Sequence, residues 1–199
     1  SQISYKNLDS PKYMILCGLY EIFENIWCAS ANFLSSAAVM ATVAEQPLAD
    51  LLSVSRARKA GAGERLRLSI VGMGLVGRRH AAAINQLSSV EICAVVDADD
   101  AITAQVANAG IESYNDLCAM INATRPDGII LSTPTNLHMS QALACVESGI
   151  PVLIEKPIAH DLAAAQSIVS KSDTLGVPVM VGHHRRFNPI IQKAKDVLT

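Results

Sequence analysis

The chain has 199 residues, half of them apolar, and a formal net charge of −2. This length and apolar content suffice for one good-sized hydrophobic core and exclude an intrinsically disordered chain. Residues 1–66 carry six basic and six acidic groups, and residues 67–199 carry ten and twelve. Neither part is therefore expected to bind nucleic acid or a membrane surface by charge.

The aromatic residues divide the chain into two parts. Six of the eight lie within the first 33 positions, and only Tyr114 and Phe187 follow. A single domain rarely distributes aromatic residues so unevenly. We therefore predict a boundary in the linker-like segment 56–65. It separates an N-terminal extension of unknown role (1–65), helical or poorly ordered, from a domain (66–199).

Within the extension, residues 26–44 form an uncharged stretch of 19 residues. Its length would permit a membrane span, but it holds five Ser, Asn or Thr residues and lacks a strongly basic flank. Three interpretations stay open, namely a helical extension or leader without function, a targeting or anchoring segment, and a partner-binding helix. We expect a cytoplasmic protein. The cysteines favour this, because they are odd in number, widely spaced and without a CxxC pair: Cys17, Cys28, Cys93, Cys118 and Cys145.

From residue 66 onward, short apolar runs alternate with helical patterns. The predicted strands span residues 66–71, 90–96, 127–132, 151–154 and 178–181. The predicted helices span residues 75–86, 98–109, 116–122, 136–147 and 161–171, and a last one begins at Asn188-Pro189. Gly110 and Gly149 are expected to close two of these helices, and Asn136 to cap one. The alternation predicts an α/β domain, a doubly wound parallel sheet of the Rossmann type.

A glycine-rich loop follows the first predicted strand. Gly72, Gly74 and Gly77 match G-x-G-x-x-G between a strand and a helix, although a tight structural turn would produce the same letters. In a dinucleotide site these glycines permit a tight turn, close approach of the pyrophosphate and close helix packing. The helix start also offers free N–H groups to phosphate. We therefore expect a nucleotide to bind along this loop, including Leu75 and Val76.

Asp97 lies 20 residues after the loop, at the end of the second predicted strand. A carboxylate at this position accepts hydrogen bonds from the adenosine ribose and repels a 2′-phosphate. The next residues include Asp99 and Asp100 and no arginine. The sequence therefore favours NAD over NADP as the cofactor. Arg78 and Arg79, in the first turn of the helix, could reach a phosphate or simply face solvent.

Four motifs follow one another in order: the glycine signature extended to His80, Ser132–His138, Glu155-Lys156-Pro157 and Gly182–Pro189. This series resembles the N-terminal domain of the Gfo/Idh/MocA oxidoreductases, the family of glucose–fructose oxidoreductase and inositol 2-dehydrogenase. The resemblance covers residues 67–199 and none of 1–65. It implies that a nicotinamide cofactor exchanges hydride with a hydroxyl-bearing carbon of a sugar, a polyol or a related compound.

The resemblance also implies roles for particular residues. Lys156 would lie beside the nicotinamide and the substrate hydroxyl, where an amine can accept the hydroxyl proton or polarise the oxygen. A solvated lysine after a strand is the alternative. Glu155 would orient Lys156 or the local backbone, and Pro157 would follow a cis peptide. Thr133 and Pro134 would line the cofactor site.

The histidines and arginines are assigned less directly. His80 is expected to pack or form hydrogen bonds beside the glycine loop, and His138 to lie in the first turn of a helix, with a catalytic role as the alternative. One of Arg185 and Arg186 is expected to touch ligand. No carboxylate or cysteine stands at ligand spacing from the pair His183 and His184, so no metal is expected.

Full-length relatives carry a second domain, a mainly antiparallel sheet that completes the substrate pocket and usually mediates homo-oligomerisation. This chain ends in the helix that would lead into that domain. Two hypotheses follow. The chain is a fragment of a longer oxidoreductase, or it is a short protein that binds NAD without catalysis, as a sensor or remnant. In either case we expect the 199 residues alone to bind NAD(H) weakly and to oxidise no polyol at a useful rate.

Overall fold

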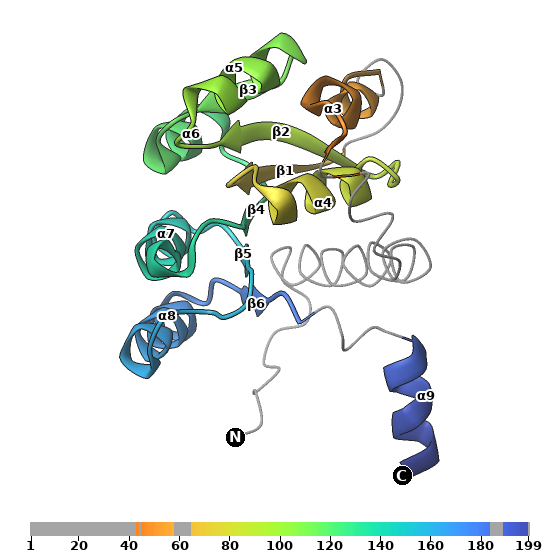
Figure 1. The fold of residues 1–199 in the computed structure, drawn as a ribbon. Coiled ribbons are helices and arrows are strands. Elements are labelled where there is room, and N and C mark those ends of the chain that lie inside the picture. Colours follow the sequence, from red (N-terminus) through yellow and green to blue (C-terminus); the bar gives the residue numbers. More distant parts are fainter. Residues whose placement is uncertain (1–42, 44, 58–64, 184–188, 199) are drawn as a thin grey trace.

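The computed structural model describes residues 43, 45–57, 65–183 and 189–198. Strands and helices alternate from Leu66 onward, as the sequence predicts (Figure 1). The strands are β1 Leu66–Val71, β2 Val90–Val96, β3 Glu112–Tyr114, β4 Gly128–Leu131, β5 Val152–Ile154 and β6 Val179–Val181. The helices are α3 Leu48–Ala57, α4 Leu75–Ile84, α5 Asp100–Asn108, α6 Leu117–Thr124, α7 Thr135–Glu147, α8 Leu162–Leu175 and α9 Pro189–Leu198.

The six strands form one parallel sheet in the order β3-β2-β1-β4-β5-β6. The chain starts in the middle at β1, runs outward to β3, crosses back to β4, and then runs outward to β6. The direction of winding therefore reverses between β1 and β4. This order confirms the predicted doubly wound fold of the Rossmann type, and ligands of such sheets bind outside the carboxyl ends of the strands at this switch point.

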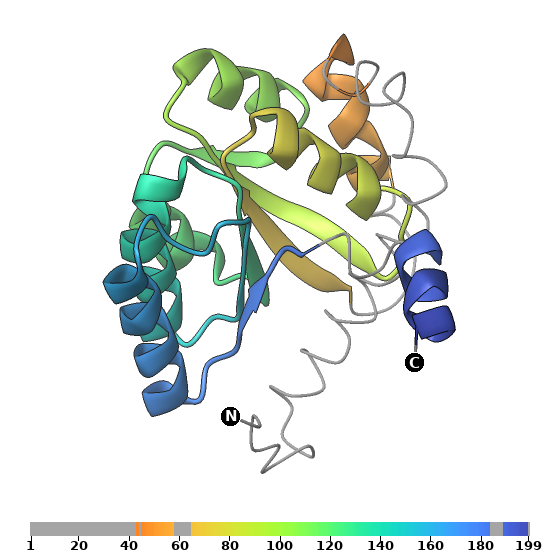
Figure 2. The same ribbon diagram turned by 60° about the horizontal axis from the view of Figure 1, so that its bottom comes forward.

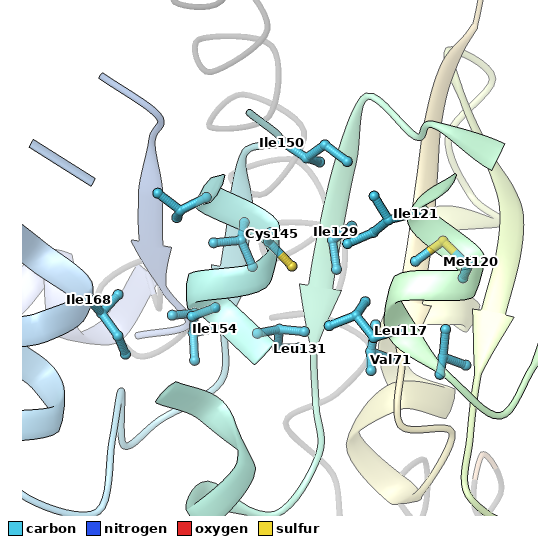
Figure 3. Close-up of a cluster of buried hydrophobic side chains, with 14 of the residues drawn as sticks. Val71, Leu117, Met120, Ile121, Ile129, Leu131, Cys145, Ile150, Ile154 and Ile168 are labelled. Carbon is cyan, nitrogen blue, oxygen red and sulfur yellow. The ribbon is translucent and has the colours of Figure 1, made fainter. Parts of the chain in front are cut away.

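Two hydrophobic clusters cover the two faces of the sheet. The first cluster joins the sheet to α3, α4 and α5, and the second joins it to α6, α7 and α8. Side chains on β4 alternate between them, since Ile130 belongs to the first cluster and Ile129 and Leu131 to the second (Figure 3). Both faces are thus buried, as the near-continuous apolar strands predict.

Helix α3 lies before the predicted domain boundary and still packs on the domain. It contacts α4, α5 and β2 (Figure 2). Its Leu48, Leu51 and Leu52 are buried in the first cluster. Arg78 Nη1 also donates to the carbonyl oxygen of Gln46, at 3.0 Å. At least this part of the extension therefore contributes to the core. The boundary near residue 65 stays a prediction.

Most of the extension, including all of residues 26–44 except Val43, lies outside the described residues. No helix within the described ranges is both long and apolar enough to cross a bilayer.

The structure tests the residues that were predicted to cap or end helices. Gly110 and Gly149 have φ values of +78° and +75° just after α5 and α7, which confirms both predicted helix ends. The predicted cap at Asn136 is wrong. Leu137 N already donates to Pro134 O at 2.9 Å, so the helix turns from Pro134 and Asn136 lies inside it. The predicted cap at Asn188 falls outside the described residues.

Candidate functional site

The glycine loop after β1 is shaped by close backbone contacts. Gly72 has φ +89°, and a Cβ there would lie 2.8 Å from the carbonyl oxygen of Ser132. A Cβ at Gly77 would lie only 1.9 Å from the carbonyl oxygen of Gly72. Both positions therefore require glycine for the turn itself and for the packing of α4 against the loop after β4.

Gly74 is different, because the protein leaves open space around it. Its φ is −68°, no atom lies within 4 Å of a Cβ built there, and the residue is exposed. The first hydrogen bond of α4 runs from Arg78 N to Gly74 O. The helix therefore leaves the amides of Leu75, Val76 and Gly77 without intrahelical partners. An open backbone surface with unused amides at a helix start fits the pyrophosphate of a dinucleotide.

Asp97 follows β2 and points its carboxylate toward the glycine loop. Its Oδ2 accepts from Met73 N at 2.7 Å and its Oδ1 from Asp99 N at 3.0 Å. Two backbone amides thus fix the orientation of the carboxylate, and each oxygen keeps a further lone pair for a hydroxyl group. This arrangement fits a ribose diol.

The residues around Asp97 are acidic, and hydrogen bonds hold their carboxylates in place. Asp99 caps α5 by accepting from Ala101 N at 2.8 Å, and Asp100 accepts from Asn115 Nδ2 at 3.0 Å. Arg78 Nη1 donates to Gln46 O, and the contact of this side chain with a phosphate stays a prediction. The end of β2 therefore combines three carboxylates.

Thr133 and Pro134 form the loop after β4, directly beside the glycine loop. Thr133 N would lie 3.0 Å from a Cβ on Gly72, so the two loops are in contact at the switch point. The Thr133 hydroxyl donates to Gln141 Oε1, and Ser132 Oγ donates to Gly72 O at 2.7 Å. Pro134 is exposed.

Lys156 follows β5 at the same edge of the sheet, and its side chain is exposed. The Lys156–Pro157 bond is cis, as predicted. The preceding Glu155 is buried and holds two donors. Its Oε1 lies 3.0 Å from His80 Nε2, and its Oε2 accepts from Lys156 N at 3.2 Å. Glu155 therefore contacts the backbone of Lys156, one of the two roles predicted for it.

Glu155 is ionised although it is buried. Burial by itself would raise the pKa of this carboxyl, but the hydrogen bond and charge of His80, together with the amide and charge of Lys156, outweigh that effect and lower the pKa below its ordinary value. A carboxylate only accepts hydrogen bonds, so His80 Nε2 is the donor. The pair connects α4, which begins at the glycine loop, to the residue before Lys156.

The sequence did not indicate how closely two histidines are tied to this edge. His80 and His138 are both buried, and their partners lie 75 and 19 residues away in the chain. The extended glycine signature marked His80, and the motif Ser132–His138 and the first turn of a predicted helix marked His138, but neither signal identified the bonding partners. His183 is exposed, whereas Arg185 and Arg186 fall outside the described residues.

No metal centre is found in the part of the chain that the structure describes. No group of three His, Cys, Asp or Glu side chains there is arranged to hold a metal ion. Cys93, Cys118 and Cys145 are free thiols. Burial raises the pKa of Cys145 to about 12, which keeps this thiol protonated and unreactive.

The curated proteins to which this chain is similar include dehydrogenases. Inositol 2-dehydrogenase 4 of Saccharopolyspora erythraea is 38% identical over 138 residues, which are 67% of this chain and 40% of that protein. The 4-carboxy-2-hydroxymuconate-6-semialdehyde dehydrogenase of Sphingobium sp. is 35% identical over 126 residues, 62% of this chain and 40% of that enzyme. The chain thus spans about two fifths of the length of these relatives.

Solved structures agree with this fold. The WlbA dehydrogenase from Bordetella pertussis, in complex with NADH and UDP-GlcNAcA, superposes with a TM-score of 0.65 at 28% identity, covering 68% of this chain and 42% of that one. The myo-inositol 2-dehydrogenase from Lactobacillus plantarum gives a TM-score of 0.64 at 25% identity, over 68% and 41% of the two chains.

The family assignment rests on more than half of the chain. Residues 66–183 match the Gfo/Idh/MocA family model, described as an oxidoreductase family with an NAD-binding Rossmann fold. The matched region begins at β1 and ends just after β6, so it contains the glycine loop, Asp97 and Lys156. The chain therefore belongs to the Gfo/Idh/MocA oxidoreductase family, of which it holds the NAD-binding Rossmann domain.

Proposed function

We propose that this domain serves a dehydrogenase that transfers hydride between NAD and a hydroxyl-bearing carbon of a sugar, a polyol or a related small molecule. Gly74, Leu75, Val76 and Gly77 bind the pyrophosphate through backbone amides. Gly72, whose own amide donates to Val96 O, makes the turn that presents them. Asp97 binds the adenosine ribose, Thr133 and Pro134 line the site, and Glu155 supports the catalytic residue Lys156.

One observation carries this proposal. The phosphate-binding loop, Asp97 and Lys156 follow β1, β2 and β5, and all three strands are parallel, so they end at the same edge of the sheet. The switch point lies between β1 and β4, with Asp97 on one side of it and Lys156 on the other. A dinucleotide that crosses the switch point with its adenosine at Asp97 therefore extends its other half toward Lys156.

The chemistry of Lys156 suits the reacting end. When bound, NAD supplies the hydride acceptor. The Lys156 amine, exposed at the carboxyl edge, is free to accept the proton that a substrate hydroxyl loses, or to donate a hydrogen bond to its oxygen. The buried Glu155 holds the Lys156 backbone amide, so the side chain projects from a fixed point.

The substrate class follows from the relatives. Curated relatives include inositol 2-dehydrogenases and a D-apiose dehydrogenase, which favours a polyhydroxylated small molecule as substrate. The semialdehyde dehydrogenase shows that the same domain also serves a different carbon framework. Homo-oligomerisation of the whole enzyme is part of this proposal.

Asp97 provides the test of the cofactor assignment. Titrating the purified chain with NADH and NADPH, followed by nicotinamide fluorescence, is expected to show tighter binding of NADH. Asp97→Ala removes hydrogen bonds to a charged acceptor and is expected to weaken NADH binding by about tenfold or more and to reduce the preference over NADPH. Asp173→Ala, an exposed aspartate on α8, serves as the control. Unchanged affinities in Asp97→Ala would remove this residue from the site.

A further inference from the structure

His138 makes two hydrogen bonds that local helix structure does not require. It lies in the first turn of α7 and is 1% exposed. Its Nδ1 lies 2.9 Å from the carbonyl oxygen of Pro157, and its Nε2 lies 2.9 Å from that of Thr133. Carbonyl oxygens only accept hydrogen bonds, so a protonated ring nitrogen donates to the carbonyl group beside it.

The two carbonyl groups belong to the two segments that bracket the reacting end of the proposed site. Thr133 follows β4 and contacts the glycine loop, whereas Pro157 comes immediately after Lys156. His138 therefore links the switch-point loop to the backbone that carries Lys156. On the other side of Lys156, the Glu155 carboxylate is held by His80 at 3.0 Å.

Apart from cysteine thiols, the buried ionisable side chains that the structure describes lie together at this place. Of the buried polar residues that the structure describes, three are titratable, namely His80, His138 and Glu155. All three lie next to Lys156. His80 contacts Glu155, the residue before Lys156, and His138 contacts Pro157, the residue after it. Glu155 itself accepts from the Lys156 amide. The other buried residues of α7, Ala142, Cys145 and Val146, are small or apolar. Burying an imidazole costs free energy unless its nitrogens are hydrogen-bonded. The groups to which a buried histidine bonds therefore indicate its role.

We propose that His138 is a positioning residue for Lys156. It does not reach the reacting atoms. Through Pro157 O it fixes the Lys156–Pro157 segment, and through Thr133 O it sets the distance of that segment from the cofactor loop. This inference rests on the proposed role of Lys156. It predicts that the position of the Lys156 amine depends on the bond to Pro157 O, and not simply on a buried polar group at position 138.

Two conservative variants separate the two bonds. An asparagine amide takes a place similar to that of imidazole Nδ1, so His138→Asn keeps a donor for Pro157 O and loses the bond to Thr133 O. A glutamine amide takes a place similar to that of Nε2, so His138→Gln keeps a donor for Thr133 O and loses the bond to Pro157 O. His138→Leu removes both. His160→Gln is the matched control, because His160 is half-exposed, three residues after Pro157, and pairs with Asp161 at 3.0 Å.

The readout is the acetylation rate of the Lys156 amine in the cofactor-free 199-residue chain, measured by peptide mass spectrometry and divided by that of Lys171 in the same sample. In His138→Gln and His138→Leu we expect this ratio to change by about fivefold, in line with the loss of one net hydrogen bond. In His138→Asn and His160→Gln we expect the wild-type ratio. Circular dichroism verifies that each variant is folded, and the Asn and Gln pair decides the outcome if the Leu variant is not.

Equal ratios in folded His138→Asn, His138→Gln and wild type would overturn the proposal, as would equal changes in the Asn and Gln variants. A separate NADH titration of the same samples tests the proposed function. The expected acetylation pattern without NADH binding would refute the cofactor site and keep the positioning role, whereas NADH binding with equal ratios would refute the positioning role alone.

Discussion

The two ends of the candidate site are built in different ways. The phosphate-binding end consists of the loop Gly72–Gly77 and Asp97. It is shaped mainly by close backbone contacts, and Asp97 and Ser132 hold the loop in place by hydrogen bonds to its backbone. The reacting end consists of Lys156 and its neighbours, and it is held by side-chain bonds from His80 on α4 and His138 on α7.

This difference explains which parts of the site the sequence could predict. A site made of backbone needs particular residues for steric reasons, so its glycines show in the sequence as a spaced motif. In a site held by side chains from distant elements, motifs can mark the single residues, here His80, His138, Glu155 and Lys156, but nothing local shows which of them bond to one another. The two ends should therefore respond differently to substitution.

The largest expected effect is at Gly77. Its substitution by alanine places a Cβ 1.9 Å from Gly72 O, a backbone atom that cannot move without opening the loop. We expect Gly77→Ala to destabilise the domain by about 3 kcal/mol or more, at the upper end for overpacking. Urea unfolding followed by circular dichroism measures this. A variant as stable as wild type would show that the loop does not pack as described.

Leu52 tests whether α3 is part of the same folding unit as the phosphate-binding end. Its side chain is fully buried in the cluster shared with α4 and α5. Leu52→Ala should lower the free energy of unfolding by about 2–5 kcal/mol, the usual cost of a cavity in a core. Leu162→Ala, at a leucine 73% exposed on α8, is the control, with an expected change within about 0.5 kcal/mol. Equal stability of the two variants would mean that α3 does not belong to the core.

Gly74 separates the needs of the ligand from those of the fold. A Cβ there meets no atom of the protein within 4 Å, so Gly74→Val should leave the unfolding midpoint nearly unchanged. The added side chain occupies the surface where a pyrophosphate would approach. We expect NADH affinity to fall by about tenfold or more, equivalent to about 1.4 kcal/mol. Calorimetric titration compares the two proteins, and undiminished affinity would place the pyrophosphate elsewhere.

The smallest expected effect concerns Glu155 at the reacting end, and it is a change in how the melting temperature depends on acidic pH. The pKa of Glu155 is lowered in the folded state, so its contribution to stability is complete above the ordinary value of 4.5 and is lost as the pH falls through the lowered value. Glu155→Gln removes this titration. Its melting temperature should therefore decline less steeply than that of wild type as the pH falls below about 4.5. The exposed Glu147→Gln on α7 provides the control, and parallel profiles for Glu155→Gln and wild type would contradict the buried pair.

The fold was predictable because its strands are apolar throughout. The predicted bounds of β1 and β2 agree with the structure at both ends, since a run of buried residues ends in each case at a glycine or an aspartate. Strand β3 was missed because its three residues, Glu112–Tyr114, are exposed or half-buried and form no apolar run. It is recognisable only from its pairing with β2.

The site was predictable only in part, for the same physical reason. Gly72, Gly77 and Asp97 lie where the motif places them, and the bond from Met73 N to Asp97 follows from the loop meeting the next strand. The bond between His80 and Glu155 spans 75 residues and joins α4, which packs on β1 and β2, to the residue after β5. No periodicity or spacing encodes such a contact. The contribution of α3 to the core also depends on packing, and it was not predicted.

Isothermal titration calorimetry of the purified chain with NADH tests the central claim most directly, provided that circular dichroism shows a folded α/β protein in the same sample. We expect saturable heat with one NADH per chain, and loss of most of that heat in Gly74→Val. Absence of heat and of affinity for both NADH and NADPH in the folded wild-type chain would contradict the account.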